Sequence, residues 1–320
     1  MEDRPDISVI IVSWNVRHLL IKCLDALLSP GVAEGLRLEV LVIDNASIDG
    51  TAEALRERPG VKLVEAGSNL GYGRANNVGF ALARGRHFLV LNPDTVPQPG
   101  SLRSLLCFMD AHPTAGIVSP RLVNADGSVQ ASAFRFPTLL MALLDLFEIP
   151  PLVPGRIRQR ILSSSLNGRY PQEAAATAPF RIDHPLGACM LLNSEAYRQV
   201  GGFDPAIHMY SEEIDLARRY AAAGWERWQV PAARVVHLGG QSTAQAPDRM
   251  FVELWRSRLY IYSKYRPLPA RMALAAILAT SQLWDALKTL AALRTGAISR
   301  EAAHRRWRRA GATIRLIFHE

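Results

Sequence analysis

Cysteine is scarce in this chain of 320 residues, with only Cys23, Cys107 and Cys189. The three stand far apart, are odd in number and form no CxxC pair, which argues against a disulfide scaffold and against a zinc site. This usage predicts buried thiols in a reducing compartment.

Long apolar runs are missing as well. The charged first residues and the short apolar segment 7–12 do not match a secretory signal, so we expect a cytoplasmic protein. A later apolar segment, 272–293, contains Asp285 and Lys288 and falls short of the roughly 20 apolar residues that span a bilayer. We expect this segment to lie on a membrane or against a partner.

The composition supplies enough apolar residues for a full core, at 49% of the chain, in one large or two ordinary domains. The formal net charge is +8, and six arginines gather around Trp307 within residues 294–309. Such a basic segment favours an anionic partner, although solvated surface charge is the alternative. Without a recognised binding module we predict no nucleic-acid partner, and a membrane surface fits at least as well.

Apolar β-branched segments alternate with segments of helical periodicity over the first 112 residues. This alternation predicts a doubly wound α/β sheet whose first half, 7–112, binds a nucleotide. The expected strands are 7–12, 39–43, 61–65 and 88–91, and the expected helices are 16–28, 51–58, one beginning near Arg74, and 101–112.

The pattern changes in the second half of the chain. Residues 136–179 contain several prolines and a basic stretch, which predicts an insertion or a mobile loop. Regular patterning resumes at Ile182 and leads to an expected helix over 212–223. The last seventy residues are predicted to be helical, so the expected domains are 1–266 and a basic helical tail, 267–320.

Carboxylates follow two of the expected strands. Asp44 ends one strand, and Asp94 follows another after Asn92 and Pro93. Because ligands bind beyond the carboxyl ends of strands in an open α/β sheet, Asp44 and Asp94 are predicted to face one site that suits a nucleotide and a metal. An isolated aspartate here would more simply cap a turn.

Glycines and polar side chains open the helix expected after the third strand, in the segment 69–79. The glycines let backbone approach a ligand, while Arg74 and Asn76 bring polar groups to a helix N-terminus, where a diphosphate is favoured. Asn76 occupies the third glycine position of GxGxxG, and no glycine follows the first strand in residues 13–17. A dinucleotide-dependent dehydrogenase is therefore disfavoured.

These segments and several later ones resemble the inverting family-2 glycosyltransferases, in their bacterial rhamnosyltransferase-like branch. The resemblance covers residues 7–242 and implies a GT-A type, Rossmann-like nucleotide-diphospho-sugar transferase fold with a mostly parallel central sheet. The helical C-terminal tail lies outside it. Eight motifs in order carry the resemblance: 12–15, 44–51, 69–79, 91–95, 187–188, 202–204, 210–216 and 237–242.

The resemblance implies a donor site in the first half of the chain. Asp44 would hold the base of the donor nucleotide, helped by Ser13 and Asn15. Arg74 and Asn76 would lie near the ribose or the diphosphate.

A metal site is implied as well. Asn92 and Asp94 take the place of the DxD element of the family, so Asn92 belongs to the donor site and Asp94 is the main metal ligand. His237 and phosphate oxygens would complete a coordination shell that points to magnesium or manganese. A lone histidine before two glycines is otherwise most often a loop or core residue.

Two acids open the helix expected from residue 212. Acids at a helix N-terminus favour the helix dipole without any further role. A transferase also needs a group that takes the proton of the acceptor hydroxyl. The resemblance implies that Glu213 is this base, although glutamate replaces the usual aspartate, and Glu212 is the alternative.

The second half, 113–266, would bind the acceptor. The resemblance implies that Asp183, Gly187 and Ala188 shape the acceptor side, with the glycine leaving room for a sugar ring. His184 stands where an aromatic residue is common in this branch.

Together these implications describe an inverting, metal-dependent glycosyltransferase. It would move a sugar, with rhamnose suggested by the branch, from a dTDP- or UDP-linked donor to a cell-envelope glycan or lipid-linked acceptor at the inner face of the cell membrane. Two alternatives stay open: a nucleotidyltransferase, for which the expected glycine-rich basic loop after the first strand is absent, and a non-catalytic protein that binds a nucleotide sugar or a glycan.

Overall fold

A computed structural model describes residues 4–33, 35–239 and 246–319. The chain divides into two compact units. The first consists of residues 1–136, 170–208 and 212–245, and the second of residues 137–169, 209–211 and 246–320. Of the motif expected at 237–242, residues 240–242 lie outside the described residues.

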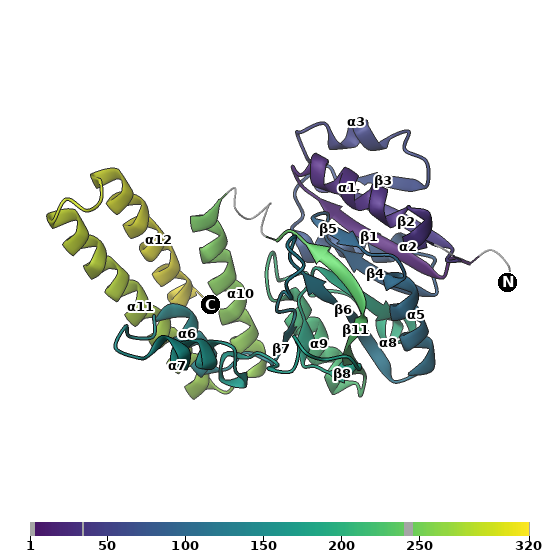
Figure 1. Ribbon diagram of the computed structural model, residues 1–320. Coiled ribbons are helices and arrows are strands. Elements are labelled where there is room, and N and C mark those ends of the chain that lie inside the picture. The colour runs from purple at the N-terminus through teal and green to yellow at the C-terminus, as the bar shows by residue number, and fades with distance from the viewer. Residues whose placement is uncertain (1–3, 34, 240–245, 320) are drawn as a thin grey trace. The chain divides into compact units, whose positions relative to one another are not determined.

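A nine-stranded mixed sheet forms the centre of the first unit (Figure 1). Strands β3, β2, β1, β4, β6 and β11 run in one direction, and β10, β5 and β8 run antiparallel to their neighbours, so the predicted mostly parallel sheet is confirmed. In spatial order the strands are β3 (Val61–Glu65), β2 (Leu38–Asp44), β1 (Ile7–Ser13), β4 (His87–Leu91), β10 (Cys189–Asn193), β6 (Ala115–Val123), β11 (Glu226–His237) and β5 (Thr95–Pro97), with β8 (Phe180–Arg181) paired to β11. A separate two-stranded sheet joins β7 (Ala133–Phe134) and β9 (His184–Pro185).

Helices cover both faces of the large sheet, because alternate residues of its buried strands point to opposite sides. On β1, Val9 and Ile11 pack in a core with Leu20 of α1. Ile10 packs in a second core with Phe80 of α4. The helices of this unit are α1 (Arg17–Leu27), α2 (Pro30–Ala33), α3 (Thr51–Leu55), α4 (Tyr72–Leu82), α5 (Ser101–Ala111), α8 (Ser194–Val200) and α9 (Glu212–Ala222).

Close packing of α4 on the sheet depends on Gly79. A Cβ atom at this position would lie 2.4 Å from Cγ2 of Ile10, a distance that real contacts do not reach. The absence of a side chain at Gly79 therefore lets α4 approach β1 closely enough to bring its first turn to the carboxyl end of the sheet.

The second unit consists of helices. They are α6 (Leu139–Leu146), α7 (Gly155–Leu162), a short 3₁₀ turn at Ser165–Asn167, α10 (Pro247–Tyr265), α11 (Leu268–Arg294) and α12 (Arg300–His319). Its core includes Ala142, Trp255, Leu274, Leu278 and Leu316, so residues of α6, α10, α11 and α12 pack together.

Two features of the second unit differ from the sequence prediction. Residues 137–169 do form an insertion in the first unit, but they contain α6 and α7 instead of one mobile loop. Helix α10 belongs with the C-terminal helices, so this unit resumes at Ala246 and not at residue 267, because Trp255 packs against α11 residues. Among the described residues, no helix combines the length and apolar content needed to cross a membrane.

The cysteines are unpaired, as their spacing predicts. Cys23 and Cys189 are buried, but Cys107 is exposed, so the prediction of a buried thiol is wrong there. Cys107 lies on α5, on the side of the helix turned away from the core residues Leu102, Leu105 and Leu106.

Candidate active site

Ser13 and Asp44 end the neighbouring strands β1 and β2 and are partners in their parallel register. Both side chains are buried, and neither Oγ of Ser13 nor Oδ1 of Asp44 has a hydrogen-bond partner. The other carboxylate oxygen of Asp44 accepts from the backbone N–H of Ser47 over 3.2 Å. Buried polar atoms normally have partners, so these two atoms are available to a ligand, and Oδ1 can accept an N–H of a nucleotide base.

Asn15 holds two loops together at this edge of the sheet. Its backbone N–H donates to Oγ of Ser47 over 3.0 Å, and its Oδ1 accepts from the backbone N–H of Ile48 over 2.8 Å. Its φ of 54° is a conformation that asparagine tolerates better than most residues. The structure thus gives Asn15 a role in shaping the loop after β2, and the predicted contact with a donor stays a prediction.

Asn45, which the sequence prediction did not single out, organises the start of α4. Its Oδ1 accepts from the backbone N–H of Leu70 over 2.8 Å, and its Nδ2 donates to Oδ1 of Asn69 and to the carbonyl of Gly71. Its position directly after Asp44 is the only sequence signal for this role. The pairing links the loop after β2 to the loop that leads into α4.

Arg74 and Asn76 face different surroundings on α4. Arg74 is exposed, and its Nε donates to the carbonyl of Pro205 over 2.7 Å. Asn76 is fully buried, and its Nδ2 donates to the carbonyl of Tyr72. Residues two apart on a helix point about 200° apart, so the structure separates the two side chains that the sequence prediction placed together.

Asp94 and His237 come together through the pairing of β5 and β11, in which His237 lies opposite Thr95. Nε2 of His237 is 3.5 Å from Oδ1 of Asp94, and both side chains are largely buried. Nδ1 of His237 is 2.7 Å from Oε1 of Gln130, a residue that no sequence signal pointed to.

Asp94 and His237 are the two side chains that could bind a divalent ion at this site. In the described part of the chain, no group of three or more His, Cys, Asp or Glu side chains could hold a metal by itself. Carboxylate and imidazole are suitable ligands for magnesium or manganese when oxygens of a bound diphosphate supply the remaining positions. Asn92 lies nearby in the chain, with a buried Oδ1 that has no hydrogen-bond partner.

Gly187 and Ala188 connect the Asn92–Asp94 loop to α9. The backbone N–H of Asn92 donates to the carbonyl of Ala188 over 2.8 Å. The carbonyl of Gly187 accepts from the hydroxyl of Tyr72 over 2.7 Å, and a Cβ at Gly187 would lie 3.8 Å from Oε2 of Glu213. The candidate metal ligand, acceptor residues and base therefore lie in one region.

Glu212 and Glu213 differ in burial. Glu212 is 3% exposed, and its Oε1 has no hydrogen-bond partner. Burial, and then the charge of Glu213, raise the pKa of Glu212 well above its usual range. Glu213 is only partly buried. Glu212 therefore holds its proton more strongly than an ordinary glutamate, and Glu213 is the more accessible of the two.

Tyr72 lies among these acids, although the sequence prediction did not select it. Burial, followed by the charges of Glu212, Glu213 and Asp94, raises the pKa of Tyr72 well above its usual range. The phenol therefore stays protonated, and its hydroxyl donates a hydrogen bond to the carbonyl of Gly187. Its position on the first turn of α4 gave no signal of this contact in the sequence.

Asp183 and His184 have structural partners in the first unit. Oδ2 of Asp183 accepts from the backbone N–H of Phe136 over 2.9 Å. His184 stacks on Phe134 and Phe136, and burial lowers its pKa to about 4. His184 is thus neutral and packs as an aromatic residue would. Asp183 therefore holds the backbone at Phe136, and its acceptor role stays a prediction.

Comparison with known proteins identifies the family. The sequence model of "Glycosyl transferase family 2" matches residues 8–197. The chain belongs to glycosyl transferase family 2. The N-acetylglucosaminyl-diphospho-decaprenol L-rhamnosyltransferase of Mycobacterium tuberculosis is 34% identical over 222 residues, which cover 66% of this chain and 69% of the relative. The succinoglycan biosynthesis protein ExoO of Rhizobium meliloti is 32% identical over 237 residues, which cover 73% of this chain and 61% of the relative.

Solved structures confirm the GT-A type fold of this family-2 glycosyltransferase. Mannosyltransferase PcManGT from Pyrobaculum calidifontis, in complex with GDP-Man and Mn²⁺, has a TM-score of 0.56 at 19% identity, over 99% of this chain and 87% of that one. GalNAc-T7 with UDP, GalNAc and Mn²⁺ has a TM-score of 0.52 at 18% identity, over 74% of this chain and 43% of that one. At these identities the likeness concerns the fold alone.

Proposed function

We propose that this glycosyltransferase moves a sugar, with rhamnose as the first candidate, from a dTDP- or UDP-linked donor to a lipid-linked or other cell-envelope glycan acceptor. The observation that carries the proposal is that the 92–94 loop and Glu213 both lie against the Gly187–Ala188 segment: the backbone N–H of Asn92 donates to the carbonyl of Ala188, and Glu213 lies beside Gly187. The rhamnosyltransferase name of the mycobacterial relative supports the sugar and the lipid-linked acceptor.

In this proposal the donor binds along the carboxyl end of the sheet. Asp44 accepts a hydrogen bond from the base, and Ser13 donates or accepts another. Asp94 and His237 would hold a divalent ion, magnesium or manganese, which when bound supplies positive charge to the leaving diphosphate. The Mn²⁺ in the two solved complexes supports a divalent ion here.

Transfer then proceeds by one displacement. Glu213 takes the proton of the acceptor hydroxyl while its oxygen bonds to the anomeric carbon. The bond from that carbon to the phosphate oxygen breaks, and the nucleoside diphosphate leaves with the electron pair. A single displacement inverts the configuration. Gly187 leaves space beside Glu213 for a sugar ring, because no side chain projects there.

A panel of nucleotide sugars tests this function. We expect purified protein to be stabilised most by dTDP-rhamnose or a UDP-sugar with Mg²⁺ or Mn²⁺, and to release nucleotide slowly from that donor. Thermal shift and nucleotide release are measured with each donor, with EDTA as the metal-free control. Stabilisation without any nucleotide release, with or without a lipid-diphosphate acceptor, would favour a non-catalytic binding protein.

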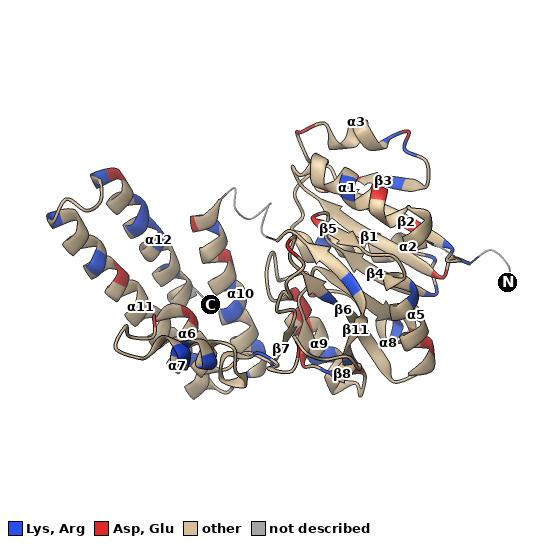
Figure 2. Ribbon diagram, in the orientation of Figure 1, with Lys and Arg blue, Asp and Glu red and all other residues tan. Residues whose placement is uncertain are grey.

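We propose a location at the inner face of the cell membrane, and the second unit carries features that support contact with a membrane surface. On α11, Met272, Leu283, Trp284 and Leu287 are all more than half exposed. Leu283, Trp284 and Leu287 follow Met272 by 11, 12 and 15 residues, so the four side chains lie along one face of the helix. Figure 2 shows several basic residues on α12, the next helix along the chain. We propose that an anionic membrane surface covers this apolar face.

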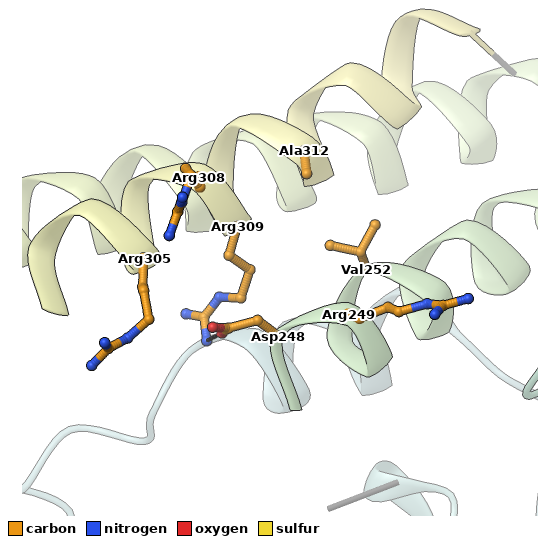
Figure 3. Close-up of a pocket in the computed structure, with 7 residues that line it drawn as sticks. All are labelled: Asp248, Arg249, Val252, Arg305, Arg308, Arg309 and Ala312. Carbon is orange, nitrogen blue, oxygen red and sulfur yellow. Dashed lines mark hydrogen bonds and ion pairs between the residues drawn. The ribbon is translucent and has the colours of Figure 1, made fainter. Parts of the chain in front are cut away.

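An arginine-lined pocket between α10 and α12 adds to this proposal (Figure 3). Its volume is about 310 Å³, and Arg309 pairs with Asp248 over 3.3 Å while lying over the ring of Phe251. The lining contains four arginines and one aspartate, and Glu301 pairs with Arg305 while Asp285 lies 3.9 Å from Arg309, so a smaller excess of positive charge remains for a phosphate group. Its lining residues are Asp248, Arg249, Val252, Arg305, Arg308, Arg309 and Ala312.

Vesicle sedimentation tests the membrane proposal. We expect the protein to sediment with phosphatidylglycerol vesicles and much less with phosphatidylcholine vesicles. The double variant Leu283→Glu, Leu287→Glu should bind phosphatidylglycerol about tenfold less, since two exposed apolar contacts are replaced by negative charge. Ile48→Glu changes an even more exposed apolar residue of the first unit and should bind as the wild type does. Equal binding of the double variant would contradict the proposal.

A further inference from the structure

Gln130 reaches the candidate metal ligand from a turn that follows β6. The turn spans residues 124–128, and the backbone N–H of Gln130 donates to the carbonyl of Leu122 over 3.0 Å. The side-chain Oε1 of Gln130 lies 2.7 Å from Nδ1 of His237. If Nδ1 of His237 carries the hydrogen of this contact, Nε2, the nitrogen that faces Asp94, has a lone pair in the neutral imidazole.

The direction of the hydrogen bonds begins at Asp126. Hydrogen bonds from the side chain and the backbone N–H of Ser128 lower the pKa of Asp126, which is therefore an ionised carboxylate that can only accept. Oγ of Ser128, 2.6 Å from Oδ1 of Asp126, must use its one hydrogen there. It can then only accept from Nδ2 of Asn124, which lies 2.9 Å away.

The contact between Asn124 and Ser128 determines the orientation of the side-chain amides of Asn124 and Gln130. With Nδ2 of Asn124 turned to Ser128, its Oδ1 faces Nε2 of Gln130 over 3.2 Å and accepts from it. Oε1 of Gln130 then faces His237 and has no hydrogen to donate. Nδ1 of His237 must therefore carry the hydrogen of this bond.

The opposite nitrogen of His237 is left with a lone pair when the imidazole is neutral. That atom, Nε2, is 3.5 Å from a carboxylate oxygen of Asp94. Two electron-pair donors that face each other without a hydrogen between them repel, unless they share a cation. The arrangement is that of a histidine ligand whose second nitrogen donates to an outer partner.

We infer that Gln130 is a positioning residue, which holds His237 in the Nδ1–H tautomer through the chain Asp126–Ser128–Asn124–Gln130 and so aims Nε2 at a divalent ion shared with Asp94. This inference rests on the proposed metal-dependent transfer. It assigns a function to a surface turn that otherwise only connects two strands.

Nitrogen NMR of the imidazole tests the inference without any metal. We expect the wild-type signals of the neutral His237 imidazole, identified by their loss in His237→Asn, to show a protonated Nδ1 and a bare Nε2. Gln130→Leu removes the acceptor and should shift the signals toward the other tautomer. Gln130→Glu keeps an acceptor and should keep Nδ1 protonated. A protonated Nε2 in the wild type, or no change in Gln130→Leu, would overturn the inference.

Mn²⁺ titration, alone and with dTDP, separates this inference from the proposed metal site. We expect Gln130→Leu to weaken Mn²⁺ binding about 10- to 100-fold, as loss of an outer partner of a histidine ligand does. Gln172→Leu, a matched change at an exposed position, should bind Mn²⁺ as the wild type does. If Asp94→Asn loses Mn²⁺ binding while Gln130→Leu retains it, the metal site stands and the role of Gln130 falls. Unchanged binding in Asp94→Asn would refute the metal site itself.

Discussion

Asp94→Asn is expected to lower the rate of sugar transfer by about 10²- to 10³-fold while leaving the fold intact, because it removes the only carboxylate of the proposed metal pair. The substitution keeps the size of the side chain and changes its charge, so the loss reports on the metal and on the leaving diphosphate. Transfer is measured as nucleotide release with a lipid-linked acceptor over a range of Mn²⁺ concentrations, and the fold by thermal unfolding.

A matched control is available at Asp110. This carboxylate pairs with Arg86 over 2.7 Å at the end of α5 and is partly exposed. Asp110→Asn makes the same chemical change outside the proposed site and should keep the wild-type rate within about twofold, since surface pairs contribute little. Wild-type transfer by a folded Asp94→Asn protein would refute the role given to Asp94.

Glu213→Gln is expected to reduce kcat by about 10²- to 10⁴-fold, the usual contribution of a general base, with little change in KM for the donor. The amide preserves the shape of the side chain but cannot take a proton from the acceptor hydroxyl. Glu212→Gln is the matched variant on the same turn. Because burial raises the pKa of Glu212 and so favours its neutral form, glutamine imitates that form, and this variant should retain most of its activity.

The two variants are compared under single-turnover conditions, so that product release does not mask the chemical step. Thermal unfolding of both proteins excludes a loss of fold, which matters most for the buried Glu212. A large loss in Glu212→Gln with a nearly normal rate in Glu213→Gln would transfer the role of base to Glu212. Normal rates in both variants would leave the proposed displacement without a base.

Local elements were predictable where short-range patterns decide them. The strand expected at 61–65 is β3, and the β-branched segment 7–12 lies within β1, because buried strands of a parallel sheet require such residues. The helix expected at 101–112 is α5. The common direction of β2, which ends at Asp44, and β4, which precedes Asp94, was predictable from the parallel sheet, while the shared site of the two carboxylates stays a prediction.

Longer-range contacts were not predictable from these patterns. Insertion of the antiparallel strand β10 between β4 and β6 carries no local signal, yet it brings Ala188 to Asn92. The packing of residues 137–169 with helices more than a hundred positions later depends on side-chain fit, which periodicity does not encode. For the same reason the sequence pointed neither to Tyr72 nor to Gln130, whose partners are 115 and 107 positions away.

By itself, the sequence determined the identity of the family and the alternation of strands and helices, because motif order and hydrophobic period are properties of neighbouring residues. Only the tertiary structure decided that Asn76 points into the protein, that Glu212 is more buried than Glu213, and that Gln130 pairs with His237. Burial and hydrogen-bond direction depend on surfaces that meet only after folding, and these surfaces set which side chains can hold a proton or an ion.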